Sequence, residues 1–273
     1  MKIALIQAEC SENIVENIGR GVEAAEMSAA EGAQIICFPE LSFQPFYPRL
    51  PAKGIEPEMT DTVPGKITET FSAVASETGT VIIINLFERD GAETYDTSAV
   101  IDTAGEIIGR TRMIHITDYS GFHEKGYYRP GDLGPGVFDT EFGRIGIAIC
   151  YDRHYPEYMR ALSLMAAEIV FVPQAGVTGE WPPGLYEAEM RVAAFQNGYY
   201  TALCNRVGRE GGLMFSGESF VCSPSGEVIA RAASGKQDIL YCDLDPGLLP
   251  ESHAHRLFLR DRRPELYRKW FGD

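Results

Sequence analysis

Residues 147–157 read IAICYDRHYPE, and they place a cysteine between a strand and a helix. The preceding run, residues 144–149, is apolar and rich in β-branched residues, whereas a helical pattern extends from Tyr155 to Ala167. At such a junction a side chain projects from the sheet and backbone N–H groups converge on the reacting atom, so Cys150 is a candidate nucleophile. A free cysteine at a strand end is also a common buried core residue. The rest of the chain has to decide between these two interpretations.

The size and charge of the chain limit the classes of protein to which it can belong. Its 273 residues, 45% of them hydrophobic, suffice for one large domain or two small ones. The formal net charge of −15 disfavours nucleic acid and anionic membrane surfaces as partners. No run approaches the roughly 20 apolar residues of a membrane span, and Met1 leads directly into a strand, which argues against a signal peptide. We expect a cytoplasmic protein that binds neither nucleic acid nor membrane.

The six cysteines follow no metal-binding pattern. None belongs to a C-x-x-C pair, and the histidines lack metal-ligand spacing, so we expect no metal ion and no other cofactor. Four cysteines lie inside apolar strand-like runs and are typical of core positions: Cys37, Cys204, Cys222 and Cys242. Unpaired cysteines fit a reducing cytoplasm. Cys150 differs from these four because polar and charged residues follow it.

Strand-like and helix-like segments predict an α/β fold. Strand–helix–strand units at 3–38 and 145–173 accompany hairpins at 97–116 and 218–230. This mixture indicates a mixed sheet, or two sheets, with helices on the outer faces. We find no linker and expect one domain over residues 1–273. The expected helices are residues 11–31, 65–77, 155–167 and 184–196, and the expected strands are 3–8, 34–38, 80–87, 97–102, 107–116, 144–150, 168–173, 199–207, 218–223, 228–230 and 239–243.

Two glutamates occupy positions typical of catalytic acids or bases. Glu40 follows an apolar strand that ends in proline, so its carboxylate emerges at the edge of the sheet where α/β proteins place their sites. Glu124 lies among aromatic residues in a long Gly- and Pro-containing loop, where apolar neighbours would raise its pKa towards the working range. Plainer interpretations stay open. Glu40 would be a solvated or capping residue, and Glu124 would pair with Lys125 or Arg129.

Several short motifs, in order and spacing, resemble the nitrilase, or carbon–nitrogen hydrolase, superfamily over almost the entire chain. Three of them contain Glu40, Glu124 and Cys150. The others are GRTRMIH at 109–115, PE at 156–157, EAEMRVA at 187–193, QNG at 196–198, NRVG at 205–208 and RDRRPELY at 260–267. The resemblance implies an α-β-β-α sandwich of two mixed sheets flanked by helices. It also implies pairing with a second subunit as a homodimer or higher homo-oligomer.

The resemblance further implies a Cys–Glu–Lys triad that hydrolyses non-peptide C–N bonds of small molecules. Cys150 matches the nucleophile, Glu40 the general base, and Glu124 a second glutamate that positions the substrate or the nucleophile. A thiol is mostly protonated at neutral pH, so a carboxylate must take its proton before the sulfur attacks an amide, ureido or nitrile carbon. The backbone N–H of Tyr151 is one expected donor to the oxyanion.

The chain departs from this pattern at the lysine. Where the family's lysine is expected, in the run at 112–115, the sequence has Met113. Arg112 is adjacent on a strand and should point to the opposite face, and Lys125 already belongs to the usual loop pattern. Loss of one oxyanion donor costs about 10²–10³ in turnover, so we predict weak or absent activity. Met113 is either a natural change that alters the chemistry or a replacement made to trap a bound compound, and the otherwise complete motif set favours the second.

The residues after the nucleophile indicate the substrate. The run at 151–154 is similar to runs in branches that hydrolyse N-carbamoyl amino acids or amines. We predict that Tyr151, Arg153, His154 and Trp181 bind the substrate. Arg153 would hold a substrate carboxylate, or else form a salt bridge with Asp152, Glu157 or Glu187. Trp181 would shape the mouth of the pocket, or else lie in a plain surface turn.

Three functions follow from the sequence. The first is a hydrolase that releases ammonia and CO₂ from an N-carbamoyl compound. The second is an aliphatic amidase or ω-amidase, with a nitrilase not excluded. The third is a catalytically inactive metabolite-binding protein, which Met113 would permit. The arginine-containing segment 252–273 is expected to pack across a dimer, or else to form a plain terminal helix.

Overall fold

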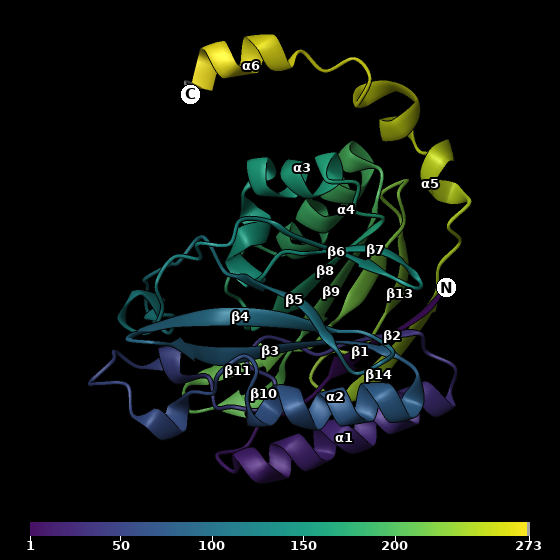
Figure 1. Ribbon diagram of the computed structural model, residues 1–273. Helices are drawn as coiled ribbons and strands as arrows, with labels where there is room; N and C mark the ends of the chain where they lie inside the picture. Colours follow the sequence, from purple (N-terminus) through teal and green to yellow (C-terminus); the bar gives the residue numbers. More distant parts are fainter. Residues whose placement is uncertain (272–273) are drawn as a thin grey trace.

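The computed structural model describes residues 1–271 and contains two six-stranded mixed sheets that face each other (Figure 1). The strand order of the first sheet is β14-β1-β2-β3-β4-β5, and that of the second is β13-β12-β9-β8-β7-β6. A short hairpin, β10-β11, lies beside them. The first sheet consists of β1 (Lys2–Gln7), β2 (Ile35–Cys37), β3 (Val81–Asp90), β4 (Glu93–Ile101), β5 (Ile107–Arg112) and β14 (Asp238–Asp243).

The second sheet repeats the mixture of parallel and antiparallel pairs. Its parallel centre is β7-β8-β9, as β1-β2-β3 is in the first sheet. Its strands are β6 (Gly136–Thr140), β7 (Gly143–Ile147), β8 (Ile169–Gln174), β9 (Tyr200–Asn205), β12 (Phe220–Cys222) and β13 (Val228–Arg231), and the separate hairpin is β10 (Val207–Glu210) with β11 (Leu213–Ser216).

Helices cover the outer face of each sheet (Figure 1). Helices α1 (Ile14–Ala30) and α2 (Lys66–Thr78) pack on the first sheet, and α3 (Pro156–Leu164) and α4 (Leu185–Asn197) pack on the second. Alternate residues of the central strands serve different cores. Ile3 and Leu5 face the opposite sheet, whereas Ala4 and Ile6 face the helices. The fold is therefore the predicted α-β-β-α sandwich.

Facing sheets bring two chain segments together that are far apart in sequence. Glu40 follows the carboxyl end of β2, and Cys150 follows the carboxyl end of β7. Both strands lie in the parallel centre of their sheets, where α/β proteins place ligands. The packing of sheet on sheet thus sets these two loops against each other.

Several predicted boundaries were wrong, and the largest errors lie beside the site. The strand predicted at 107–116 ends at Arg112, because the carboxylate of Asp152 accepts the N–H groups of Ile114 and His115 and takes them out of the ladder. The strand predicted at 144–150 ends at Ile147, and Cys150 begins a 3₁₀ turn. The sequence analysis also missed β6, β10 and β11 and the turn at Gly91 that joins β3 to β4. The hairpin turns at 103–106 and 223–227 were predicted correctly.

The C-terminal segment runs along the outside of the molecule. It contains α5 (Leu248–Glu251), a π-helical turn (Ala254–Phe258) and α6 (Pro264–Phe271), and α6 stands off the body beyond α3 (Figure 1). Residues 272–273, the end of the segment that we expect to pack across a dimer, lie outside the described residues. Within residues 1–271, none of the helices combines the length and the apolar character that a membrane crossing requires.

Candidate active site

Cys150 lies in a tight turn at the end of β7. Its φ is +42°, a left-handed backbone conformation that residues other than glycine and asparagine rarely adopt. The turn is held by Arg153, whose Nη1 donates to the carbonyl oxygen of Cys150 at 2.8 Å and to Gln174 Oε1 at 2.8 Å. The Cys150 side chain is buried against the core between the two sheets. The turn therefore presents the thiol at the sheet interface.

Glu40 is held by a second left-handed turn. Leu41, directly after it, has φ +46°, and its N–H donates to Asn85 Oδ1 at 2.7 Å. The Glu40 side chain is fully buried. Neither of its carboxylate oxygens has a hydrogen-bond partner within the described residues. A buried carboxylate without donors is costly. Such a group indicates a proton, a neighbouring acid or a ligand at that position.

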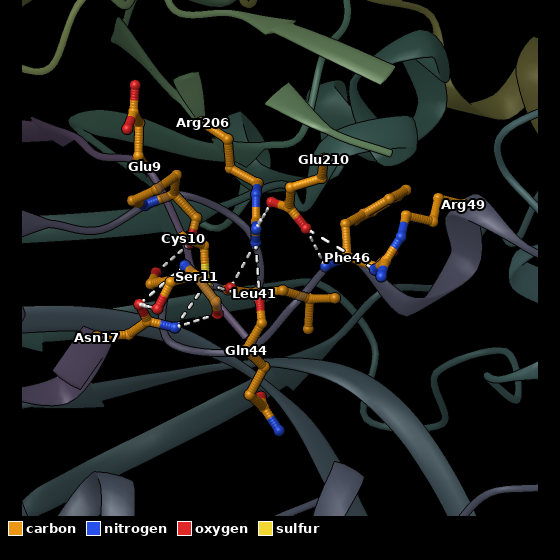
Figure 2. Close-up of polar contacts among 12 residues, drawn as sticks. Glu9, Cys10, Ser11, Asn17, Leu41, Gln44, Phe46, Arg49, Arg206 and Glu210 are labelled. Atoms are coloured by element: carbon orange, nitrogen blue, oxygen red, sulfur yellow. Dashed lines mark hydrogen bonds and ion pairs between the residues drawn. The ribbon is translucent and has the colours of Figure 1, made fainter. Parts of the chain in front are cut away.

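Arg206 fixes this turn from behind (Figure 2). Its Nη1 donates to the carbonyl oxygens of Leu41 at 2.5 Å and Gln44 at 3.2 Å, and its Nη2 pairs with Glu210. Glu210 in turn accepts the N–H of Phe46 at 2.8 Å. The guanidinium is buried, so a single side chain from the end of β9 sets the backbone that carries Glu40.

Glu124 comes from the loop between β5 and β6. It starts a 3₁₀ turn, is fully buried, and accepts the N–H of Thr117 at Oε2 (3.2 Å), whereas its Oε1 has no partner in the described part of the chain. The aromatic loop residues Phe122, Tyr127 and Tyr128 join the same core as Cys150. The Glu124 side chain pairs with neither basic residue considered in the sequence analysis.

Met113 belongs to the same buried core and has no exposed surface. Its N–H donates to the carbonyl oxygen of Asp96 at 2.9 Å, and its own carbonyl accepts the N–H of Gly131 at 2.8 Å. Neither neighbouring cation takes its place. Arg112 donates to Glu88 at 2.8 Å and to other acids away from Cys150, and Lys125 is exposed.

Asp96, on β4, is a buried acid in the site that the sequence analysis missed. Its Oδ1 accepts Nδ2 of Asn85 at 2.6 Å, and its Oδ2 has no hydrogen-bond donor within the described structure. Asn85 thus links Asp96 to the turn after Glu40 through two hydrogen bonds. A polar residue in an alternating strand gives no local signal of this role, because the neighbours across the sheets are not visible in the sequence.

Burial and mutual repulsion raise the pKa values of the acids around Cys150. Burial, followed by the charge of Glu124, raises the pKa of Glu40 from its ordinary value of 4.5 to about 7, although the charge of Arg206 acts against the rise. Burial and then the charge of Glu40 raise the pKa of Asp96 well above its usual range. Burial also raises the pKa of Glu124. At neutral pH these carboxyl groups therefore share protons.

Burial, followed by the charges of Glu40 and Glu124, also raises the pKa of the Cys150 thiol well above its usual value. The thiol is protonated at neutral pH and needs a base to become a nucleophile. The charge of the buried Glu40 carboxylate acts on this thiol, and the pKa of Glu40 is raised to about 7. The arrangement can therefore transfer the thiol proton to a carboxylate.

The predicted substrate-binding residues line the turn after Cys150. Nε of Arg153 lies 3.3 Å from Glu189 Oε2, and its guanidinium stacks 4.6 Å from the ring of Tyr186. The arginine is thus in an ion pair, although with none of the three acids considered from the sequence. Nδ1 of His154 lies 2.6 Å from Glu189 Oε1, and its ring packs 5.2 Å from that of Trp181. The roles of these residues stay predictions.

Tyr151 follows the nucleophile and packs its ring 4.9 Å from His154 and 5.9 Å from Tyr155. The role of its backbone N–H as an oxyanion donor stays a prediction.

Glu180 is a further acid near Cys150 that sequence reasoning missed. Its carboxylate accepts hydrogen bonds from the hydroxyl groups of Tyr119 and Tyr186, and the N–H of Val177 donates to it at 3.2 Å. Its charge raises the pKa of the Cys150 thiol. Three donors satisfy the Glu180 carboxylate and hold it in place beside the site.

No set of three or more His, Cys, Asp and Glu side chains within residues 1–271 has the arrangement that a metal ion requires. All six cysteines are unpaired thiols.

Comparisons with known proteins agree with this fold and these segments. The family profile described as "Carbon-nitrogen hydrolase" matches residues 2–253. N-carbamoylputrescine amidase of Arabidopsis thaliana is 32% identical, with 97% of this chain and 93% of that protein covered. Citrullinase of Francisella tularensis is 32% identical, with 98% and 96% covered. The crystal structure of a carbon-nitrogen hydrolase from Helicobacter pylori G27 superposes with a TM-score of 0.91 at 29% identity, and covers 99% of this chain and 98% of that one.

Proposed function

This chain belongs to the carbon–nitrogen hydrolase family, and from that premise we propose that it hydrolyses a C–N bond of a small molecule through a covalent intermediate on Cys150. The observation that supports the proposal is a buried thiol, Cys150, beside the buried Glu40 carboxyl, whose charge acts on the thiol and whose own pKa is raised to about 7. General bases work best when their pKa lies near the operating pH.

The proposed reaction has two halves. Glu40 takes the thiol proton, the Cys150 sulfur attacks the substrate carbon, and the proton passes to the leaving nitrogen, which departs as ammonia or an amine. Glu40 then takes a proton from water, which attacks the carbon; the C–S bond breaks with its electrons on sulfur, and Glu40 returns the proton to the sulfur. The N–H of Tyr151 donates to the developing oxyanion, and Glu124 holds the substrate nitrogen.

We propose N-carbamoyl (ureido) compounds as the first substrate class to test. Support comes from the names of two relatives, an N-carbamoylputrescine amidase and a citrullinase, whose compounds both carry a ureido group. Simple carboxamides and nitriles are the alternative, because they need the same nucleophile and base.

Met113 should make hydrolysis of these neutral compounds slow. A thioether has roughly the length of a lysine side chain but neither charge nor donor. The oxyanion loses a partner, and turnover should fall by about 10²–10³ relative to a site with lysine there. Slow turnover of neutral ureido compounds is therefore part of the proposal.

Ammonia release tests this function. N-carbamoylputrescine, L-citrulline, N-carbamoyl-β-alanine and acetamide are assayed with the native chain, Met113→Lys and Cys150→Ala. We expect slow release by the native chain, a gain of about 10²-fold with Met113→Lys, and none with Cys150→Ala. Release that survives in Cys150→Ala, or no release from any compound by either of the other two proteins, would refute the proposal.

A second candidate is a binding protein that has lost catalysis, which the buried Met113 favours. Iodoacetamide separates the two, because a catalytic site activates its thiol through Glu40. If iodoacetamide modifies Cys150 no faster than the buried Cys204, and Glu40→Gln leaves the rate at Cys150 unchanged, the chain is a binding protein without catalysis.

We also propose that two copies associate as a homodimer through the C-terminal segment. Support comes from α6, which stands off the body, and from Trp270 and Phe271, which are 65% and 78% exposed. Light scattering on the full chain and on a chain truncated after Arg260 tests this. A monomeric mass for the full chain contradicts it.

A further inference from the structure

The acids beside Cys150 form one buried group on the side of the site where the lysine is expected. We call Glu40, Asp96 and Glu124 the carboxyl cluster. Each side chain is fully buried. Four of their six oxygens lack a hydrogen-bond donor among the described residues, and so does the buried hydroxyl group of Tyr128 next to them. Buried acceptors without donors are satisfied by shared protons or by a ligand that brings several N–H groups.

Asp96 and Met113 are neighbours across β4 and the end of β5. Thr97 pairs with Arg112 in the ladder, and the N–H of Met113 continues it to the carbonyl oxygen of Asp96 at 2.9 Å. Directly opposite residues have their side chains on the same face of a sheet. The thioether of Met113 and the carboxyl of Asp96 therefore share one place in the site, which holds an acid and no cation.

Two buried arginines near this cluster act on it, since the charge of Arg206 lowers the pKa of Glu40 and that of Arg153 lowers the pKa of the Cys150 thiol, but each already has an acidic partner. Arg206 is paired with Glu210 and with backbone carbonyl groups (Figure 2). Arg153 is paired with Glu189 and donates to Gln174. Glu180, on another side of Cys150, adds one more negative charge. The field at the sulfur is therefore suited to a cation.

We propose that the preferred substrate is a cationic amidine or guanidine, whose planar N–H groups bind the carboxyl cluster while Cys150 attacks the central carbon. This inference rests on the Cys150 chemistry proposed above and names its substrate class. An amidinium offers parallel N–H donors in the geometry that carboxylates accept bidentately. A lysine at position 113 would repel this cation, and Met113 does not.

The chemistry of an amidinium also removes the need for the lysine. Glu40 takes the thiol proton, the C–S bond forms, and the π electrons of the C=N bond move to nitrogen, so the adduct is neutral and no oxyanion develops. The proton on Glu40 passes to one nitrogen, the C–N bond breaks, and ammonia leaves with the electron pair. The remaining cation on Cys150 is a thioimidate or thiouronium.

Water completes the reaction. Glu40 takes a proton from the attacking water, the C–O bond forms, and the C–S bond breaks with its electrons on sulfur. The sulfur regains a proton from the new hydroxyl group as the C=O bond forms. The proton that Glu40 took from water passes through solvent to the released ammonia, which becomes ammonium, and Glu40 returns to its ionised form. An amidinium and water give an amide and ammonium, and a guanidinium and water give a ureido compound and ammonium.

Matched pairs of compounds test the inference. Agmatine and N-carbamoylputrescine share the aliphatic ammonium group and the chain length, and differ only in a guanidinium or a ureido group at the reacting carbon. Acetamidine and acetamide are a shorter pair. We expect kcat/KM for the cationic member to exceed that for the neutral member by about 10²-fold or more in the native chain.

Two variants locate the cause of this preference. Asp96→Asn should lower the ratio about tenfold or more, because it removes one charged acceptor. Met113→Lys should invert it. Glu93→Gln is the matched control, because it removes an exposed carboxyl of the same strand, one that pairs with Arg129 at the surface, and should leave the ratio unchanged.

A second readout does not depend on turnover. Chloroacetamidine and chloroacetamide alkylate thiols, and only the first is cationic. We divide the alkylation rate of Cys150 by chloroacetamidine by its rate with chloroacetamide, and divide this ratio by the same ratio for free cysteine. The result should be about 10 or more in the native chain and should fall in Asp96→Asn. Peptide mapping identifies the alkylated residue.

The outcomes separate this inference from the proposed function. One outcome is that Met113→Lys hydrolyses N-carbamoylputrescine, but the native chain hydrolyses neither agmatine nor acetamidine and does not react faster with chloroacetamidine. The amidinium inference is then wrong and the proposed function stands. A rate ratio of one or less within both pairs overturns it as well. If no variant releases ammonia from any compound, the proposed function fails, and the inference fails with it.

Discussion

Replacement of the buried base by its neutral isostere should stabilise the fold in a pH-dependent way. Glu40→Gln keeps the shape of the side chain and removes its charge. The pKa of Glu40 is about 7 in the folded chain against 4.5 ordinarily. Because the folded-state pKa is raised, the folded protein is fully favoured below the unfolded pKa and loses stability as the pH rises through 7. A tenfold change in an ionisation constant corresponds to about 1.4 kcal/mol, so native Glu40 costs about 3 kcal/mol at pH 8 and almost nothing at pH 4.

Thermal unfolding at several pH values measures this difference. A change of 1 kcal/mol shifts the melting temperature of a chain of this size by about 2–4 °C, so Glu40→Gln should melt roughly 6–12 °C above the native chain at pH 8 and together with it at pH 4. Loss of the Glu40 charge also removes its repulsion of Asp96 and Glu124, which stabilises the variant further at pH 8. The exposed Glu58→Gln is the control and should change neither value. An equal shift at both pH values, or none at pH 8, would refute the assignment of a raised pKa to Glu40.

Three further predictions concern the groups that hold the site. The rate constant kcat/KM should rise about tenfold per pH unit up to pH 7 and then level off as Glu40 ionises; a flat profile from pH 5 to 9 would exclude Glu40 as the base. Arg206→Met leaves Glu210 buried without its partner, so the free energy of unfolding in urea should fall by about 3–5 kcal/mol and kcat should fall as well. A loss of stability below about 1 kcal/mol would contradict the role of Arg206 in holding the turn after Glu40. Asp152→Ala should speed hydrogen exchange at the amides of Ile114 and His115, and unchanged exchange there would show that Asp152 does not anchor this segment.

Much of the architecture could be predicted because local sequence patterns indicate the helices and turns. Amphipathic periodicity located the four large helices, and the turn residues at 103–106 and 223–227 located two hairpins. The family resemblance supplied the arrangement of the two sheets, and the prediction of a carbon–nitrogen hydrolase is confirmed. Strand ends were predicted less well where a distant side chain, such as Asp152, captures the backbone.

The site was predictable where a residue ends a strand or lies in a conspicuous loop. Met113 and Cys150 belong to one buried core, and the charges of the buried Glu40 and Glu124 act on the Cys150 thiol; the catalytic roles of these residues stay predictions. Asp96 was not predicted, because it lies within a strand whose partners are set by the sheets. Glu180 was missed for a similar reason: the tyrosine hydroxyl groups that hold it come from segments on either side of it in the sequence.

The chain's chemistry depends on whether the sulfur of Cys150 becomes bonded to the substrate carbon. Mass spectrometry of the acid-quenched protein during turnover of acetamidine, followed by peptide mapping, tests this directly. We expect an added mass on the peptide that contains Cys150, absent from the other five cysteines and lost in Glu40→Gln. Turnover without an adduct on that peptide, or an adduct that forms as fast on Cys204, would contradict the account.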